Sequence, residues 1–154
     1  MKYAHSVKTR MILNKDEEEE GKDLLLRLFS DNPQGFLEDE EVSIDTSYAE
    51  GLHGEDIVVL EWMCDKERNI NMFIKRLVAN LEDEVLEELA TQTDRFDDDL
   101  NFYIRLDKEG FEKGEWSIVT SGDCIHIRIH IAAYPAKRSA AEKKIKELFV
   151  DKIL

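Results

Sequence analysis

Residues 124–131 read Cys-Ile-His-Ile-Arg-Ile-His-Ile, an unbroken alternation of polar and apolar side chains. Successive side chains of a β-strand point to opposite faces of its sheet, so this alternation predicts a half-buried strand. We expect the isoleucine face to pack on a core, because β-branched residues suit a pleated, buried surface. The opposite face carries the polar side chains Cys124, His126, Arg128 and His130. We expect this strand to lie at the centre of the sheet, with its polar face toward water or an anionic partner.

The same pattern predicts further strands over residues 4–13, 41–49, 57–64 and 100–107, with a short one at 116–118. In the first of these, Lys8 and Arg10 point outward. In residues 41–49 we expect Tyr48 to point inward, and we expect residues 57–64 to be buried on much of both faces. These two strands should form an antiparallel hairpin or part of a meander.

Helical spacing of apolar residues predicts helices between the strands. Residues 66–81 follow this spacing without a miss, and residues 83–90 continue it. An earlier helix should begin near Asp16 and stop near Asp31-Asn32-Pro33, because proline disfavours helix in the residue before it. Residues 108–114 fit a helical turn, and the last helix should begin at Tyr134-Pro135, since proline suits a first turn.

Length and composition bound the class of protein. The chain has 154 residues, of which 42% are hydrophobic and 36% charged, and we expect one domain spanning residues 1–154. No apolar run is long enough to span a membrane, and a signal-peptide core is missing from the N-terminus. Two cysteines, Cys64 and Cys124, fall in predicted strands, which favours buried thiols and a reducing, cytoplasmic location.

The net charge of −14 is unevenly distributed. Residues 1–15 contain four basic and no acidic residues, and residues 124–154 contain seven basic and three acidic ones, so each end carries +4. The middle segment, 16–123, carries −22 from 10 basic and 32 acidic residues. An acidic protein of this kind can still present a local basic surface, provided that its two ends meet in space.

The residues that could carry chemistry argue against an enzyme, a cofactor or a metal site. His126 and His130 are separated by about 13 Å along a strand, too far for a shared metal ion. The acidic run 94–99 lacks the glycine and the distant glutamate of a calcium-binding EF-hand loop. Neither a serine elbow nor a glycine-rich phosphate loop is present, and both cysteines lie inside strands.

The outward faces of three predicted strands hold basic and aromatic residues. These are Lys8, Arg10, Tyr103, Arg105, His126, Arg128 and His130, with Lys137 and Arg138 following the last strand. Arginine suits phosphates, and exposed Tyr or His rings can stack on unpaired bases. The same side chains are also ordinary on a solvated face, so composition alone leaves both interpretations open.

Four segments carry a resemblance to a known family. They are His5-Ser6-Val7, Gly51-Leu52-His53-Gly54, Leu-Asn-Phe-Tyr-Ile-Arg-Leu-Asp-Lys at 100–108, and residues 122–138, which end in Tyr-Pro-Ala-Lys-Arg. In this order they resemble an archaeal family described as RNA-binding proteins or predicted exosome subunits, over about residues 5–150. The chain departs from the family pattern at Glu55-Asp56, where Asn-Pro is favoured, and at Glu109, where Gln is frequent.

The resemblance implies a two-layer α+β fold, with helices packed on one face of a mainly antiparallel sheet. It also extends the candidate RNA contacts to Lys108. The full candidate set is Lys8, Arg10, Tyr103, Arg105, Lys108, His126, Arg128, His130, Lys137 and Arg138.

Two functional hypotheses follow. The first is a non-catalytic RNA-binding accessory protein of RNA processing or exosome-linked degradation, whose partners are RNA and other RNA-processing proteins. The second is a protein-interaction or assembly subunit, such as a homodimer, that does not bind RNA directly.

Overall fold

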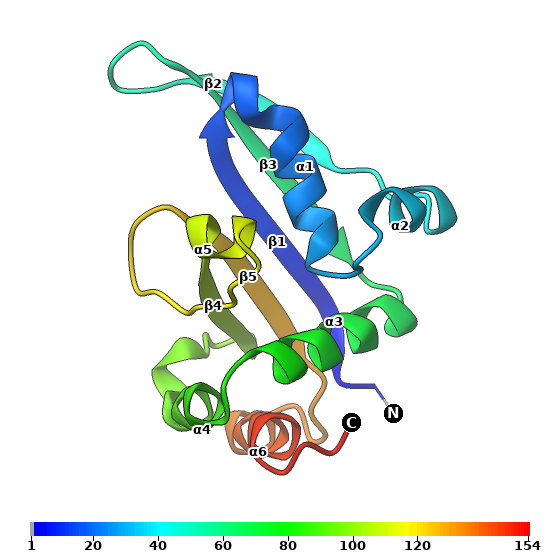
Figure 1. Ribbon diagram of the computed structural model, residues 1–154. Coiled ribbons are helices and arrows are strands. Elements are labelled where there is room, and N and C mark those ends of the chain that lie inside the picture. Colours follow the sequence, from blue (N-terminus) through cyan, green and yellow to red (C-terminus); the bar gives the residue numbers. More distant parts are fainter. Residues whose placement is uncertain (1) are drawn as a thin grey trace.

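Five strands form one antiparallel sheet in the order β2-β3-β1-β5-β4 (Figure 1). The computed structural model describes residues 2–154. The strands are β1 (Ala4–Asn14), β2 (Asp45–Glu50), β3 (Asp56–Cys64), β4 (Asn101–Asp107) and β5 (Cys124–Ile131). The middle position belongs to β1, and β5 lies next to it as an interior strand paired on both sides, as expected for residues 124–131. One neighbour of β5 is β1. The first strand of the chain therefore pairs with the last one.

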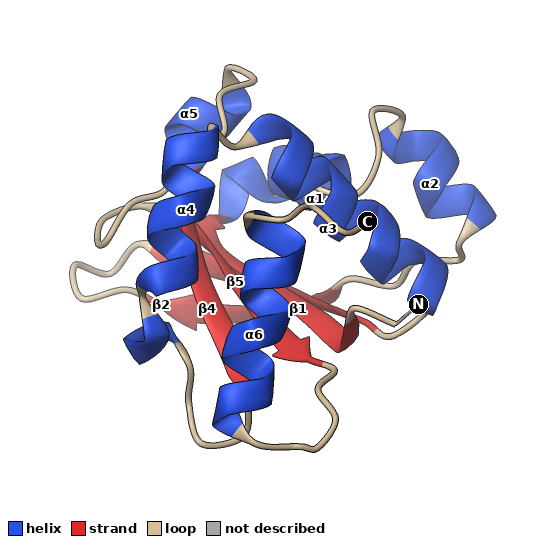
Figure 2. Cartoon of the chain, turned by 90° about the horizontal axis from the view of Figure 1, so that it is seen from below, coloured by secondary structure: helices blue, strands red, loops and turns tan. Residues whose placement is uncertain are grey.

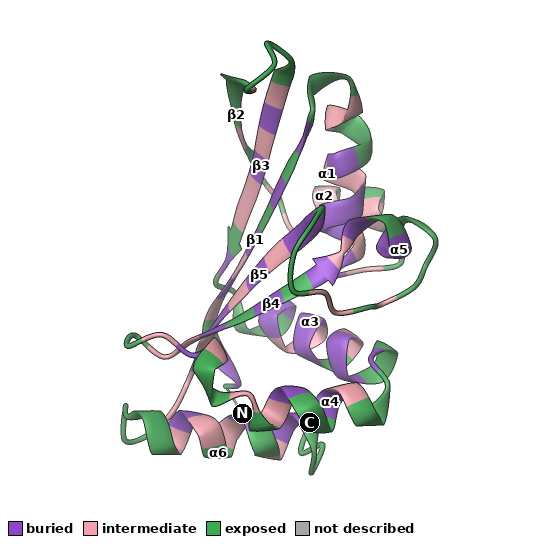
Figure 3. Ribbon diagram, turned by 90° about the vertical axis from the view of Figure 1, so that its left-hand side faces the viewer, coloured by how far each residue is buried: buried purple, intermediate pink, exposed green. Residues whose placement is uncertain are grey.

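The helices lie on one side of the sheet and around one end of it, as Figure 3 shows from the side. They are α1 (Glu18–Arg27), α2 (Pro33–Asp39), α3 (Glu67–Asn80), α4 (Asp83–Thr91), α5 (Lys108–Glu112) and α6 (Arg138–Phe149), with 3-10 turns η1 (Lys15–Glu17) and η2 (Thr93–Arg95). In Figure 2, α4 and α6 lie side by side across the strands. Within the described chain no helix covers the opposite side of the sheet, and the predicted α+β class is confirmed.

The core lies between the sheet and these helices. All four isoleucines of β5 are at most 1% exposed, as the alternation predicts. Ile129 lies between Val7 of β1 and Phe102 of β4 in one cross-strand row, and all three are buried. Cys64 and Cys124 are free and buried, which confirms the expected core thiols.

Two helix boundaries differ from the predicted ones. Asp31-Asn32-Pro33 does follow a helix, but it also starts α2, which the sequence reading missed. The Asn32 side chain accepts a hydrogen bond from the Gly35 amide at 3.2 Å, and Pro33 occupies the first turn. Asn32 and Pro33 therefore form the start of α2 and also follow the end of the preceding helix, α1. The last helix begins at Arg138, three residues after Pro135.

The β2–β3 hairpin forms as predicted, but its burial does not follow the prediction. Tyr48 is 58% exposed. It lies on the helix-side face of the edge strand β2, where its hydroxyl donates to Glu18 Oε1 at 2.6 Å. In β3, Val58 and Leu60 are buried, whereas Val59 between them is only half-buried. The strand is therefore buried on one face, because no second layer covers the other.

Candidate nucleic-acid interface

The uncovered side of the sheet carries two rows of polar side chains that run across neighbouring strands. Directly paired residues on adjacent strands point to the same face, so the strand register defines each row. The first row contains Glu61 of β3, Arg10 of β1, His126 of β5 and Arg105 of β4. The second row contains Lys8 of β1, Arg128 of β5 and Tyr103 of β4. We call these seven residues the outer face.

The outer face forms because the register of β1 and β5 places the polar residues of one strand opposite the polar residues of the other. Arg10 lies opposite His126 and Lys8 opposite Arg128, while Val7 and Met11 of β1 and the isoleucines of β5 point to the core. If the register of either strand shifted by one residue, its charged side chains would point into the core. Burial of the isoleucines therefore also determines which face carries the basic residues. The two net-positive ends of the chain therefore meet in space, which is the condition for a basic surface.

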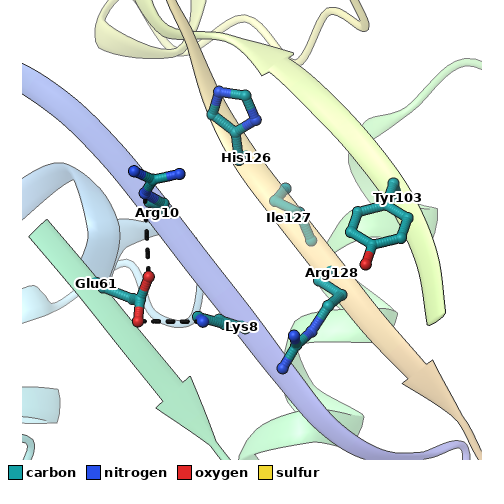
Figure 4. A pocket seen from close by; sticks show the side chains of 7 residues that line it. All are labelled: Lys8, Arg10, Glu61, Tyr103, His126, Ile127 and Arg128. Carbon is teal, nitrogen blue, oxygen red and sulfur yellow. Dashed lines mark ion pairs between the residues drawn. The ribbon is translucent and has the colours of Figure 1, made fainter. Parts of the chain in front are cut away.

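A hollow of about 200 Å³ lies in the outer face (Figure 4). Its lining is Lys8, Arg10, Glu61, Tyr103, His126, Ile127 and Arg128. One carboxylate serves two of the cations: Glu61 lies 3.1 Å from Lys8 Nζ and 4.0 Å from Arg10 Nε. The lining holds three basic side chains with permanent charge and one acid, so the hollow has an excess of positive charge.

Arg128 is the cation that this carboxylate does not balance. Its Nε is buried and has no hydrogen-bond partner among the described residues. No carboxylate in residues 2–154 pairs with it, and the cross-strand neighbour is the cation Lys8. Like charges placed directly opposite each other on a sheet are unfavourable. An anion between Lys8 and Arg128 would relieve that repulsion and balance the charge of Arg128.

Tyr103 presents an aromatic ring beside Arg128 on the edge strand β4. The residue is 43% exposed, and its hydroxyl donates to Asp97 Oδ2 at 2.9 Å. This hydrogen bond to Asp97 raises the pKa of Tyr103. Burial alone would raise the pKa of the Asp97 carboxyl, but bonds from Asn101, Tyr103 and Asp99 hold it below the ordinary value. The ring is thus anchored by a carboxylate that stays ionised.

His126 lies in the first row between two arginines. Partial burial, and after it the charges of Arg105 and Arg10, lower the pKa of His126. Arg105 Nη1 donates to the Thr120 carbonyl at 2.8 Å, which holds the guanidinium at the edge of the sheet. His126 is therefore poised to gain a proton when a negative group approaches.

His130 lies beyond the two rows, opposite Asn101 and Ser6. An irregularity in β1 between Ala4 and Ser6 brings the His5 ring to 5.0 Å from the His130 ring. These two imidazoles extend the polar side of β5 toward its end.

Besides His130, three candidate residues lie apart from the outer face. Lys108 begins α5, is only 7% exposed, and pairs with Asp123 at 2.7 Å. Lys137 is exposed at the start of α6. Arg138 lies over the Phe96 ring, donates to the Thr93 carbonyl and pairs with Glu142. The structure therefore brings seven of the ten candidates to the uncovered side and holds Lys108 and Arg138 in local contacts.

Two acidic residues of this site were missed by sequence reasoning. Glu61 alternates with the buried Leu60 and so lies outward on β3, a signal that alternation could have revealed. Asp97 gave no such signal, because its contact with Tyr103 depends on how the loop before β4 folds back. Within residues 2–154, no three His, Cys, Asp or Glu residues cluster closely enough to hold a metal. No helix in the same range is long and apolar enough to cross a membrane.

An uncovered antiparallel sheet with basic and aromatic rows is typical of a nucleic-acid-binding domain. The sequence model of a family described as RNA binding matches residues 6–131. This match covers most of the chain and all five strands except the first two residues of β1. The chain belongs to this RNA-binding family, which confirms the resemblance. The family is named for binding and not for catalysis.

Individual relatives agree with this assignment. An RNA-binding protein of Pyrococcus abyssi is 29% identical over 146 residues, covering 94% of this chain and 92% of the relative. A DUF54 protein from Methanothermobacter thermautotrophicus has a solved structure with a TM-score of 0.74 and 30% identity, covering 96% of this chain and 98% of that one. A DUF54-family protein from Archaeoglobus fulgidus gives a TM-score of 0.76 at 27% identity, with 94% and 99% covered.

Proposed function

We propose that this protein binds RNA through its outer face, as a non-catalytic accessory protein. The observation that carries the proposal is the convergence of Lys8, Arg10, Arg105 and Arg128 from three strands on a side that no helix covers. Glu61 pairs with Lys8 and Arg10 there, and Asp45 of β2 lies opposite Glu61 on the same side, so the cations still outnumber the acids of the two rows. Membership of an RNA-binding family supports RNA as the partner. His130 and Lys137 would extend the contact beyond the two rows.

A salt series on a double variant tests this proposal. Arg105→Ala with Arg128→Ala removes two cations from β4 and β5, and with them about two phosphate contacts. We expect weaker binding of single-stranded RNA and a log–log salt slope that is lower by about 1.4, taking about 0.7 per phosphate for single strands. Filter retention between about 50 and 200 mM salt measures both quantities.

The matched control is Arg68→Ala with Lys75→Ala. Both residues lie on α3, whose other side packs against β1, and the control changes the net charge by the same amount. Its slope should equal that of the wild type. Equal slopes for the two double variants would contradict the proposed face, and undetectable binding by the wild type at low salt would contradict RNA binding itself.

The role in RNA processing or exosome-linked degradation is the narrower part of the proposal, and the resemblance to predicted exosome subunits supports it. Capture of partners from native cell extract, with and without nuclease, tests this role. Recovery of RNA-processing proteins in the untreated extract is the expected result, and nuclease resistance would identify direct protein contacts. Absence of such proteins in both samples would contradict the role.

The assembly hypothesis is favoured by one feature, the edge strand β2. Five of its six residues are exposed, and the tip of its hairpin presents Leu52 at 98% exposure. An exposed strand edge can pair with another chain. Light scattering would show a homodimer as a doubled mass, and loss of that mass in Thr46→Pro would place the contact on β2.

A further inference from the structure

The second row of the outer face combines a cation pair and an aromatic ring within one short span. Lys8 lies directly opposite Arg128 in the strand register, and Arg128 lies directly opposite Tyr103. The three residues therefore form one row across β1, β5 and β4. At about 4.8 Å between strands, the row is about 10 Å long. Its residues line the same hollow.

The surroundings of Tyr103 keep its ring in place with one face available. Asp97 holds the hydroxyl at 2.9 Å, and Figure 4 shows the ring face-on, on the side of the strands away from the helices. The ring has no stacking partner among the aromatic pairs of residues 2–154. A fixed, exposed ring beside an unbalanced arginine can bind a planar base together with its phosphate.

We infer that the outer face selects single-stranded RNA, with one unpaired base stacked on Tyr103 and a neighbouring phosphate bound between Arg128 and Lys8. This inference rests on the proposed function and specifies the form of RNA that the face takes. Arg128 is the cation that the phosphate would balance, since no carboxylate in residues 2–154 pairs with it. The hollow of about 200 Å³ gives a phosphate or sugar room beside the ring.

Duplex RNA does not fit this arrangement. Bases inside a helix are stacked on both faces by their neighbours, so none is free to cover an aromatic ring. Only an unpaired nucleotide can place a base on Tyr103 while its phosphate reaches Arg128. A purely electrostatic surface would bind duplex at least as well, because its phosphates are more densely packed.

The experiment compares two RNAs of about 12 nucleotides, one single-stranded and one annealed to its complement, by fluorescence anisotropy. Wild type should prefer the single strand. Tyr103→Leu should weaken single-strand binding roughly 5- to 150-fold, equivalent to about 1–3 kcal/mol for one base stacked on an aromatic ring. Its salt slope should not change, because no charge is removed. Tyr103→Phe keeps the ring and should stay within about threefold of wild type.

Tyr48→Leu is the matched control. Tyr48 is also an exposed tyrosine on an edge strand with its hydroxyl bonded to a carboxylate, but it lies on the helix-side face. This variant should bind like the wild type. If Tyr103→Leu also binds normally, or if wild type binds duplex as tightly as single strand, the single-strand inference is wrong. Weakening by Arg105→Ala with Arg128→Ala would still support the proposed function in that case, whereas no binding to either RNA by wild type would overturn both.

Discussion

Glu61 offers a perturbation that should strengthen RNA binding. Its carboxylate is the acidic group that lines the hollow, and it pairs with Lys8 and Arg10 from the neighbouring strand. A phosphate that reaches these cations must approach the carboxylate as well. Glu61→Gln keeps the size of the side chain and removes the negative charge, so both cations become available to the phosphate.

The size of the effect follows from the geometry. The carboxylate lies 3.1 Å from Lys8 Nζ, so a phosphate on the far side of this ammonium would be roughly 6 Å from Glu61. Two negative charges at that distance repel by about 0.7 kcal/mol in water and by about 2.8 kcal/mol at an effective dielectric of 20. The distance is shorter than the Debye length of about 10 Å near 0.1 M salt, so screening is incomplete. We expect RNA affinity to rise by at least about 3-fold, the value that corresponds to the repulsion in water.

Anisotropy with single-stranded RNA measures this gain, and Glu87→Gln provides the control. Glu87 is exposed on α4, and its substitution changes the net charge by the same single unit at a distance from the outer face. That variant should change affinity less than about twofold, since exposed charges beyond a Debye length are largely screened. Stability of Glu61→Gln should fall by no more than about 1 kcal/mol, the usual limit for a partly exposed ion pair. If Glu61→Gln binds RNA no better than Glu87→Gln, the phosphate does not approach Lys8 and Arg10.

Two further predictions concern stability. Burial, followed by the charges of Arg105 and Arg10, lowers the pKa of His126 from its ordinary value of 6.5, so the folded protein binds this proton less readily than the unfolded chain. Its contribution to stability is complete above about pH 6.5 and is lost as the pH falls through the lower folded value. Between about pH 7.5 and 5.5 the urea-unfolding free energy of His126→Gln should therefore fall less than that of wild type, and equal losses would contradict this assignment. Ile129→Ala should lower the unfolding free energy by about 2–5 kcal/mol, because it leaves a cavity between Val7 and Phe102 in the core. The control Ile153→Ala, at an exposed position, should change it by less than about 0.5 kcal/mol. An equally small change for Ile129→Ala would contradict the burial of Ile129 between these two residues.

The strands were predictable from the sequence because alternation records burial directly. Residues 124–131 and 100–107 each have one face on the core, so period-two spacing locates the strand and also says which side chains point outward. Pairing was not predictable in this way. Alternation alone does not show which strands far apart in the sequence are neighbours, and β1 takes the central place because β3 and β5 both pair with it. Tyr48 shows the same limit, since an apolar pattern cannot tell an edge strand from a covered one.

The candidate site was predictable to the extent that it depends on strand parity. Lys8, Arg10 and Arg128 are outward because their neighbours in the strand are buried, and the structure brings them together. Lys108 and Arg138 are the first residues of α5 and α6, so strand parity does not apply to them, and local contacts with Asp123 and Glu142 set their positions. Asp97 was beyond reach, because a loop conformation places it next to Tyr103.

The net charge of −14 is compatible with RNA binding because of where the acids lie. The acidic middle segment supplies β2, β3, β4 and the loops between elements as well as helices α1 to α5. The helices lie on the covered side of the sheet or around its end, whereas Asp45 of β2 and Glu61 of β3 share the uncovered side with Arg10. A helix is about 10–12 Å across, so acids on its far surface lie more than about 10 Å from the outer face. Near 0.15 M salt the Debye length is about 8 Å, and most of that negative charge is screened before it reaches an RNA on the opposite side. The local balance around Lys8, Arg10, Arg128 and Glu61 then decides binding, and the total charge affects mainly the long-range approach.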